Sequence, residues 1–151
     1  MLGRLSETEI EAVLRREIIG RVACHSDGKT YVVPITYAYD TGAIYAHSAG
    51  GLKLRMMRAN PNVCFEVDRM EDLANWQSVV AWGRFEELAG PEADHCMALL
   101  LARLLPLAAS SETSHPTPKS LTHQHRALEE GLVSVAYRIA ISEMSGRFER
   151  R

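Results

Sequence analysis

The sequence predicts a mainly β protein with peripheral helices, folded as one domain over residues 1–151. Two observations predict this class. Five or six short β-rich segments follow one another along the chain, with few helical segments between them. Tight turns such as Asp27-Gly28-Lys29 and Asp40-Thr41-Gly42 join them, and tight turns favour antiparallel neighbours. A meander of this kind is typical of an antiparallel barrel, either closed or split.

The first half of the chain is expected to form a helix, a meander and a second helix. Ser6-Glu7-Thr8-Glu9 has the pattern of a capping box and predicts a helix that ends near Arg16. A short helix ends at Asn60-Pro61, because proline cannot continue it. The predicted strands span residues 18–25, 31–39 and 43–47, and the second helix spans 52–59.

The second half alternates long strands with one apolar helix. Pro91 suits the first turn of a helix, whose apolar residues include Leu100 and Leu104. The segment from Pro106 to His125 is rich in Ser, Thr, Pro and His, and predicts an exposed loop. The strands are predicted over residues 63–68, 77–87 and 132–142, with a polar loop over 70–75.

Composition argues against several classes of partner. The formal net charge is −2, without the basic excess that is typical of nucleic-acid-binding proteins. No apolar run is long enough to span a bilayer, and the N-terminal segment lacks the apolar middle of a signal peptide. Cys24, Cys64 and Cys96 contain no CxxC pair, so neither a zinc site nor a disulfide framework is predicted. We expect a cytoplasmic protein without nucleic-acid or membrane partners.

A loop of small residues, His47-Ser48-Ala49-Gly50-Gly51-Leu52-Lys53, connects a predicted strand to a predicted helix. Glycines let backbone N–H groups approach an anion, and the helix N-terminus favours negative charge. Ser48 can donate a hydroxyl, and Lys53 supplies a positive charge for a phosphate. Arg55 and Arg58 add further positive charge for the phosphate where they lie on the same face of the helix as Lys53. The alternative is a flexible turn with a solvated lysine.

Pro34 lies within a β-rich run, Val32-Val33-Pro34-Ile35-Thr36-Tyr37. Proline has no N–H for a ladder, so this strand is expected at a sheet edge or a bulge. An edge strand offers backbone donors and acceptors to a flat heterocycle, although an ordinary edge strand protected by proline is the alternative. Trp76 and Trp82 are expected on one face of a strand, as cofactor platforms or as core or interface residues. Gly83 predicts a bulge or a close backbone approach.

Among the histidines, His47 lies beside the loop and is a candidate proton donor or substrate contact. His115, His123 and His125 fall in the polar segment and are expected to be solvated, so no metal site is predicted. No GxSxG motif supports a hydrolase.

Together these motifs resemble the pyridoxamine 5′-phosphate oxidase-like, FMN-binding split-barrel superfamily. The resemblance rests on GRVAC at 20–24, YVVPITYAYD at 31–40, IYAHSAGGLKLRMMRANPNVCFEVD at 44–68 and WQSVVAWGRFEEL at 76–88. The chain looks closest to the branch of the nitroimidazole-resistance reductases, in which an H-S-x-x-x-G-K-like loop precedes N-P-x-V-C-F-E-V-D. The resemblance implies an antiparallel split β-barrel that binds FMN.

It further implies a homodimer with two FMN sites at the subunit interface. The backbone of the strand would follow the isoalloxazine ring and the ribityl chain, and the loop would hold the phosphate. His47 matches a histidine near the reactive face of the flavin, which makes it the candidate catalytic side chain. The cofactor-binding residues implied by the resemblance are Val33, Pro34, Ile35, Thr36, His47, Ser48, Leu52, Lys53 and Ser78.

Two departures argue against a true pyridoxamine phosphate oxidase. The oxidases end in a motif with arginine and tryptophan, whereas Tyr137 to Arg147 contains no tryptophan, and Leu52 replaces a basic residue. We therefore expect a nitroreductase-like, FMN-dependent oxidoreductase that passes electrons from a small-molecule donor to a small acceptor. The alternatives are a non-catalytic flavin carrier or redox sensor, a split barrel that holds haem or a deazaflavin, and an interaction module without cofactor.

Overall fold

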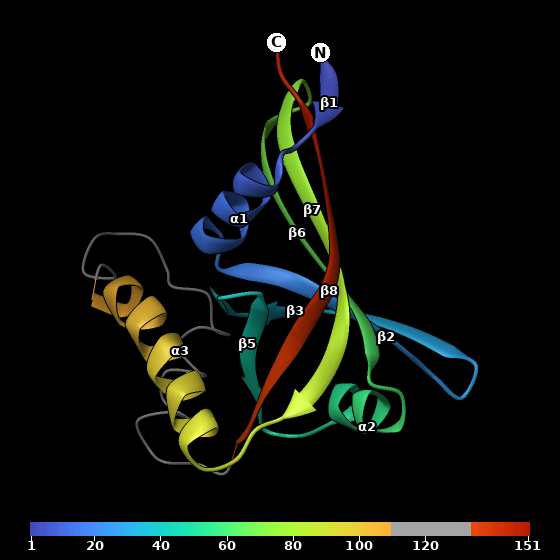
Figure 1. Ribbon diagram of the computed structural model, residues 1–151, viewed down its shortest axis with the longest axis vertical. Coiled ribbons are helices and arrows are strands. Elements are labelled where there is room, and N and C mark those ends of the chain that lie inside the picture. The colour runs from blue at the N-terminus through green and yellow to red at the C-terminus, as the bar shows by residue number, and fades with distance from the viewer. Residues whose placement is uncertain (110–133) are drawn as a thin grey trace.

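One antiparallel sheet of eight strands forms the body of the computed structural model, which describes residues 1–109 and 134–151 (Figure 1). Seven strands are ordered β3-β2-β6-β7-β8-β5-β4, and β1 pairs with β8. The strands are β1 (Leu2–Arg4), β2 (Ile19–Ser26), β3 (Lys29–Thr36), β4 (Ala38–Asp40), β5 (Ala43–Ser48), β6 (Asn62–Asp72), β7 (Asn75–Glu87) and β8 (Val135–Glu149). The helices are α1 (Glu7–Arg16), α2 (Leu52–Ala59) and α3 (Pro91–Ala109).

The sheet curls without closing. β3 and β4 lie at opposite edges of the strand order, yet Tyr37 alone separates them in the chain. The two edges must therefore approach each other, although no ladder joins them within the described residues. This is the split form of the predicted barrel, and the predicted strand 31–39 is broken where the chain crosses from one edge to the other.

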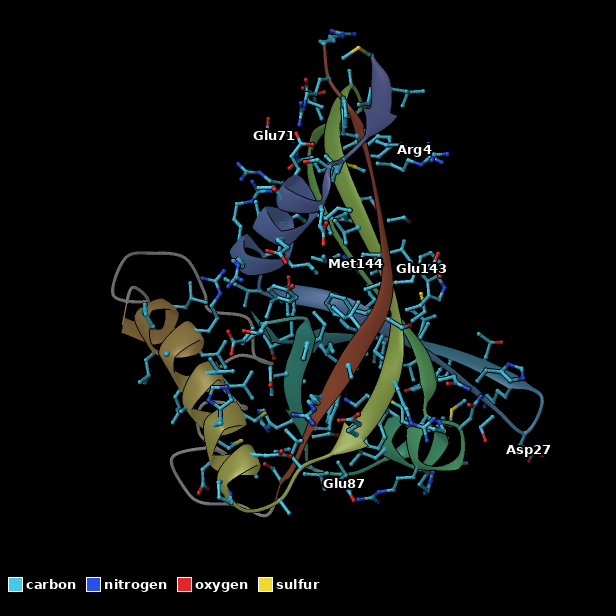
Figure 2. All side chains as sticks on the ribbon, viewed as in Figure 1. Arg4, Asp27, Glu71, Glu87, Glu143 and Met144 are labelled. Carbon is cyan, nitrogen blue, oxygen red and sulfur yellow. The ribbon has the colours of Figure 1, made fainter. Side chains whose placement is uncertain are left out.

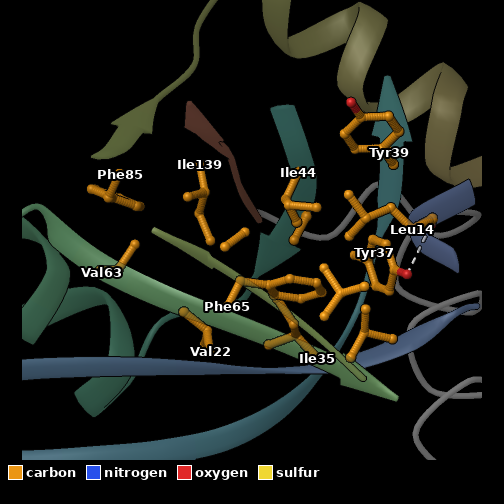
Figure 3. Close-up of a cluster of buried hydrophobic side chains, with 14 of the residues drawn as sticks. Leu14, Val22, Ile35, Tyr37, Tyr39, Ile44, Val63, Phe65, Phe85 and Ile139 are labelled. Atoms are coloured by element: carbon orange, nitrogen blue, oxygen red, sulfur yellow. Dashed lines mark hydrogen bonds between the residues drawn. The ribbon is translucent and has the colours of Figure 1, made fainter. Parts of the chain in front are cut away.

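The main core fills the inside of the curled sheet (Figure 3). The apolar stripe of α1 enters it through Val13 and Leu14, and the predicted capping box of Ser6 and Glu9 is present. Tyr37 is fully buried, and its hydroxyl donates a hydrogen bond of 2.8 Å to the carbonyl of Leu14. Its ring meets Phe65 edge-on at a centroid distance of 4.8 Å. These contacts fix α1 against the crossing between the two sheet edges.

A second apolar cluster lies between α3 and the strands β4, β5 and β8. Cys96 and Leu100 of α3 are fully buried there. The helix continues through Pro106, so the predicted loop starts too early in the sequence. The apolar contact surface of α3, which includes Leu104, extends to this turn of the helix. The rest of that predicted loop, with its three histidines, lies outside the described residues.

Two long strands exceed their predicted bounds. β6 continues to Asp72 through the expected loop 70–75, and β8 continues to Glu149 instead of ending at residue 142. Both segments are mostly polar, and the long partner strand β7 supplies the ladder that holds them. Gly83 lies at a register shift in that ladder, where a Cβ would come within 2.4 Å of the carbonyl oxygen of Ala140. The predicted bulge is thus confirmed.

No helix within the described ranges is long and apolar enough to cross a membrane.

Candidate functional site

The loop from Ser48 to Leu52 connects β5 to α2 with a conformation that requires glycine. Gly50 and Gly51 have φ angles of +122° and +104°, which side-chain-bearing residues rarely adopt. Gly51 is the N-cap of α2 and makes no side-chain cap hydrogen bond. The Ser48 hydroxyl instead donates to the Gly50 carbonyl at 3.1 Å. The first turn of α2 therefore presents N–H groups without a side-chain cap, together with the positive end of the helix dipole.

Lys53 lies on this first turn and is half-buried. Burial lowers the pKa of its ammonium, and the nearby Cys24 thiol acts in the opposite direction. No carboxylate within residues 1–109 and 134–151 forms a salt bridge with Lys53. Arg58 differs, because its Nε donates to Glu87 at 2.9 Å, and Arg55 is exposed. Lys53 is thus a partly desolvated cation that has no counter-ion among the described residues, at a helix N-terminus without a side-chain cap.

His47 is 8% exposed, and neither ring nitrogen has a hydrogen-bond partner in the described part of the chain. It lies near the end of β5, a strand buried along its whole length, and pairs with Ala136 of β8. Burial lowers the pKa of His47, and the nearby Lys53 lowers it further. The imidazole is therefore neutral at pH 7, with one donor and one acceptor unused. Buried polar groups are usually paired, so two ring nitrogens without a partner among the described residues make His47 an exception.

The edge strand β3 presents the predicted residues on two faces. Val33 and Ile35 face the main core, and Leu52 of α2 packs against the same core. Pro34 is exposed and lies opposite Arg21 of β2, which confirms its expected place on an edge strand. Thr36 is buried at the end of β3.

Ser78 lies far from the loop in this chain. Ser78 pairs with Asp68 of β6 and with Arg147 of β8. At the other end of β7, Glu87 pairs with Tyr137, and the neighbour of Tyr137 in the chain, Ala136, pairs with His47. Nine residue steps separate Ser78 from Glu87, and they span about 30 Å along the strand. One chain therefore brings His47, Ser48, Leu52 and Lys53 together but not Ser78.

Ser78 belongs instead to a polar network on the outer face of the sheet. Its hydroxyl lies 3.5 Å from Glu66, and Arg21 forms ion pairs with Glu66 at 3.1 Å and with Asp68 at 3.4 Å. Burial and the neighbouring Asp68 raise the pKa of Glu66.

Two features near Cys24, which neighbours Lys53, were not predicted. The Tyr137 hydroxyl is buried without a hydrogen-bond partner in the described chain, and burial raises its pKa. A cavity of about 370 Å³ opens where β2 and β6 separate beyond their last pair, Ala23 and Cys64. Cys24 and Trp82 are among its lining residues. No local pattern marks either feature, because each arises from strands that are far apart in the sequence.

Comparison with known proteins extends these observations. The family model described as pyridoxamine 5′-phosphate oxidase matches residues 6–148. The chain belongs to the pyridoxamine 5′-phosphate oxidase family. A crystal structure of an FAD-binding protein from Mesorhizobium loti is 33% identical, with 98% of each chain covered and a TM-score of 0.71. The expected family and the split-barrel fold are thereby confirmed.

One further solved structure and one sequence relative also match this chain. A candidate 5-nitroimidazole antibiotic resistance protein from Bacteroides thetaiotaomicron shares the fold, with a TM-score of 0.69 at 18% identity, covering 98% of this chain and 87% of that one. An uncharacterized protein from Rhizobium meliloti is 35% identical over 91 residues. That match covers 60% of the relative's length and 60% of this chain.

Proposed function

We propose that this chain is an FMN-dependent oxidoreductase whose flavin phosphate binds at the N-terminus of α2. The observation that carries the proposal is the pairing of an uncapped helix N-terminus with Lys53, a half-buried cation without a counter-ion among the described residues. A terminal phosphate would satisfy both, because it accepts several hydrogen bonds and carries negative charge. The flavin-binding relative from M. loti supports a flavin as the ligand.

The proposed site gives each residue a role that follows from its position. Lys53 and the first amides of α2 would hold the phosphate, and Ser48 would lie beside it. The backbone of β3 from Val33 to Thr36 would border the ring. Bound flavin would supply hydride or electron transfer. His47 is the proposed catalytic residue, since its neutral ring can donate one hydrogen bond and accept another at a site that excludes water.

We further propose that a second copy of the chain completes the site. Ser78 is about 30 Å along β7 from the loop end of the sheet, so Ser78 of the partner subunit would have to reach the flavin. Register places Val32, Ala23, Cys64 and Trp82 in one row across the outer face of the sheet. Val32 is 58% exposed and Trp82 is 40% exposed, and apolar side chains exposed in a row are typical of an interface.

The first experiment is an absorbance spectrum of the purified protein, before and after addition of FMN and desalting. Flavin bands that persist, with FMN released on denaturation, are expected. Release of FAD would keep the flavin and correct the nucleotide, and a Soret band would replace flavin with haem. Retention of a deazaflavin instead of FMN would likewise change the cofactor. A colourless protein that retains no flavin would refute the proposal.

Turnover separates the enzyme from a carrier or redox sensor. The flavin-loaded protein is mixed with NADH or NADPH and a panel of nitroaromatic acceptors, and acceptor reduction is followed by absorbance. A carrier or sensor would retain FMN without turnover.

The molar mass of the protein in solution tests the proposed homodimer. It should be twice the chain mass of 16.8 kDa.

A further inference from the structure

The outer face of the sheet carries a row of apolar side chains at the end of β7 opposite the loop site. β1, β8, β7 and β6 lie side by side there, and their register aligns Leu2, Glu149, Trp76 and Met70 across the four strands. Leu2 is 71% exposed and Met70 is 63% exposed, while Trp76 is half-buried. Apolar side chains that gather in one exposed row are typical of a binding surface.

The helix that packs against these strands, α1, lies on their other side. Its Val13 belongs to the main core together with Val79 of β7, and the side chain of Val79 points to the opposite face from Trp76 because strand residues alternate. Figure 2 shows Arg4, which belongs to the next row of the outer face, on the side of the strands away from α1. Within the described residues the apolar row is therefore open to a ligand or to a second chain.

The Trp76 ring is held in place by a hydrogen bond of 3.2 Å from its Nε1 to Glu149. This bond satisfies the one polar group of the indole and leaves the face of the ring for stacking. Met70 lies directly across the ladder from Trp76 and adds a polarisable thioether, which makes favourable contacts with aromatic rings. A fixed indole beside a thioether favours a flat aromatic ligand.

The row lies next to the residue that the proposed homodimer brings to the flavin. Ser78 is two residues from Trp76 on β7, so both side chains are on the outer face, about 7 Å apart along the strand. Where the partner subunit's Ser78 reaches the flavin, the partner subunit's Trp76 lies beside it. Within a single chain, by contrast, about 35 Å along β7 separates Trp76 from Glu87 at the loop end.

On the basis of the proposed flavin site and homodimer, we propose that Trp76 and Met70 of one subunit form a wall of the acceptor site beside the partner's flavin, and that this wall selects flat aromatic acceptors. Both side chains act by binding, because they hold the ring of the acceptor and exclude water from it. Electron transfer is supplied by the bound flavin. Leu2 continues the same row and extends the apolar surface at its rim.

The first test measures how close Trp76 is to the flavin. A Trp82→Phe variant leaves Trp76 as the single tryptophan, and its molar mass in solution shows whether it is a dimer. The variant is then titrated with FMN. Energy transfer from an indole to a flavin falls steeply with distance, so most of the Trp76 emission should be lost at saturation. The flavin of the same chain, about 35 Å away, would quench it only slightly.

The second test measures the acceptor contact without turnover. The oxidised FMN-loaded protein is titrated with nitrobenzene in the absence of an electron donor, and the change in flavin absorbance gives the dissociation constant. Trp76→Leu should weaken nitrobenzene binding roughly 2- to 12-fold, the range for an aromatic pair, whereas Trp76→Phe should retain most of the affinity because it keeps a ring. Nitroethane has the nitro group without the ring, and its binding should not distinguish these variants.

Met70 provides a second variant that does not depend on Trp76. Because Met70 is exposed, Met70→Ser should fold normally and still weaken nitrobenzene binding. Leu105→Ser is the matched control, since Leu105 is an exposed apolar residue of α3 outside the row. Circular dichroism checks that each variant is folded.

Two results would overturn this inference and leave the proposed function intact. One is a dimer that binds FMN while the Trp76 emission stays unchanged, which would place the row away from the flavin. The other is nitrobenzene affinity that is the same in Trp76→Leu, Met70→Ser and Leu105→Ser. A protein that retains no FMN, or that is a monomer, would instead refute the proposed function, and the inference with it.

Discussion

Replacing Lys53 by methionine should weaken flavin binding while leaving the flavin-free protein at least as stable. Lys53 is half-buried, burial lowers its pKa, and no described carboxylate compensates its charge. In the flavin-free protein the ammonium therefore costs desolvation energy, and methionine keeps the aliphatic contacts without that cost. In the complex the ammonium gains a charge-assisted hydrogen bond of about 1.5–3 kcal/mol. Its loss should raise the FMN dissociation constant roughly 10- to 150-fold.

Two measurements on the same variant test this reasoning. FMN fluorescence quenching gives the dissociation constant, and urea unfolding of the flavin-free protein gives the free energy of unfolding. Arg55→Met on the exposed face of α2 is the matched control and should change neither quantity much. Unchanged FMN affinity in Lys53→Met would remove Lys53 from the site. A loss of flavin-free stability would show instead that the ammonium stabilises the fold.

Three further predictions follow from buried groups and close contacts. The pKa of His47 is lowered in the folded chain, so the unfolded chain takes up the proton first as the pH falls. The free energy of unfolding should therefore decrease below about pH 6.5, by at most ~1.4 kcal/mol per pH unit. Urea unfolding at several pH values should show that the His47→Gln variant loses this pH dependence and that a variant of the exposed His25, His25→Gln, keeps it. Gly83→Ala should lower the free energy of unfolding in urea by roughly 2–4 kcal/mol, because its Cβ would lie 2.4 Å from a backbone oxygen of β8. In Gly28→Ala the new Cβ meets no atom within 4 Å, so the loss should be about 1 kcal/mol and come from the positive φ alone. Tyr137→Phe removes a buried hydroxyl that has no partner among the described residues, and it should leave the thermal midpoint unchanged or higher; a clear loss would reveal a hydrogen bond to a bound water or ligand.

The elements that the sequence predicts best are those with local signals. α2 spans residues 52–59 as predicted, since glycines precede it and Asn60-Pro61 ends it. The capping box of Ser6 and Glu9 likewise places α1. The edge position of β3 follows from Pro34, which lacks a donor for a second ladder. In each case a few neighbouring residues decide the outcome.

The elements that the sequence misplaces are decided by distant partners. The polar end of β6 through Asp72 has no strand pattern of its own, and it is a strand because β7 pairs with it across the hairpin. Helix α3 passes through Pro106 although proline normally ends a helix, and apolar contacts with β5 and β8 favour its continuation. Tertiary contacts outweigh local preference in both segments.

The same division applies to the candidate site. The loop with Ser48 and Lys53 is visible in the sequence, because glycines and a lysine before a helix form a local pattern. Whether a basic residue is available to a ligand is not local. Arg58 is engaged by Glu87, which lies 29 residues away in the chain, whereas Lys53 finds no carboxylate among the described residues. Lys53 and Arg58 look equivalent in sequence, but the fold leaves them with different partners.

The burial of His47 and the charge of Lys53, which has no ion pair among the described residues, support each other as evidence for a ligand. Either one alone has an ordinary structural explanation, since a buried histidine or a half-buried lysine occurs in many cores. Together they leave an imidazole and an ammonium near each other, each desolvated and without a hydrogen-bonding or ionic partner in the described residues. Folding alone gains nothing from this arrangement, because both groups lose hydration and Lys53 lowers the pKa of His47 further. A single ligand with an anionic end and a polar edge would satisfy both groups at once.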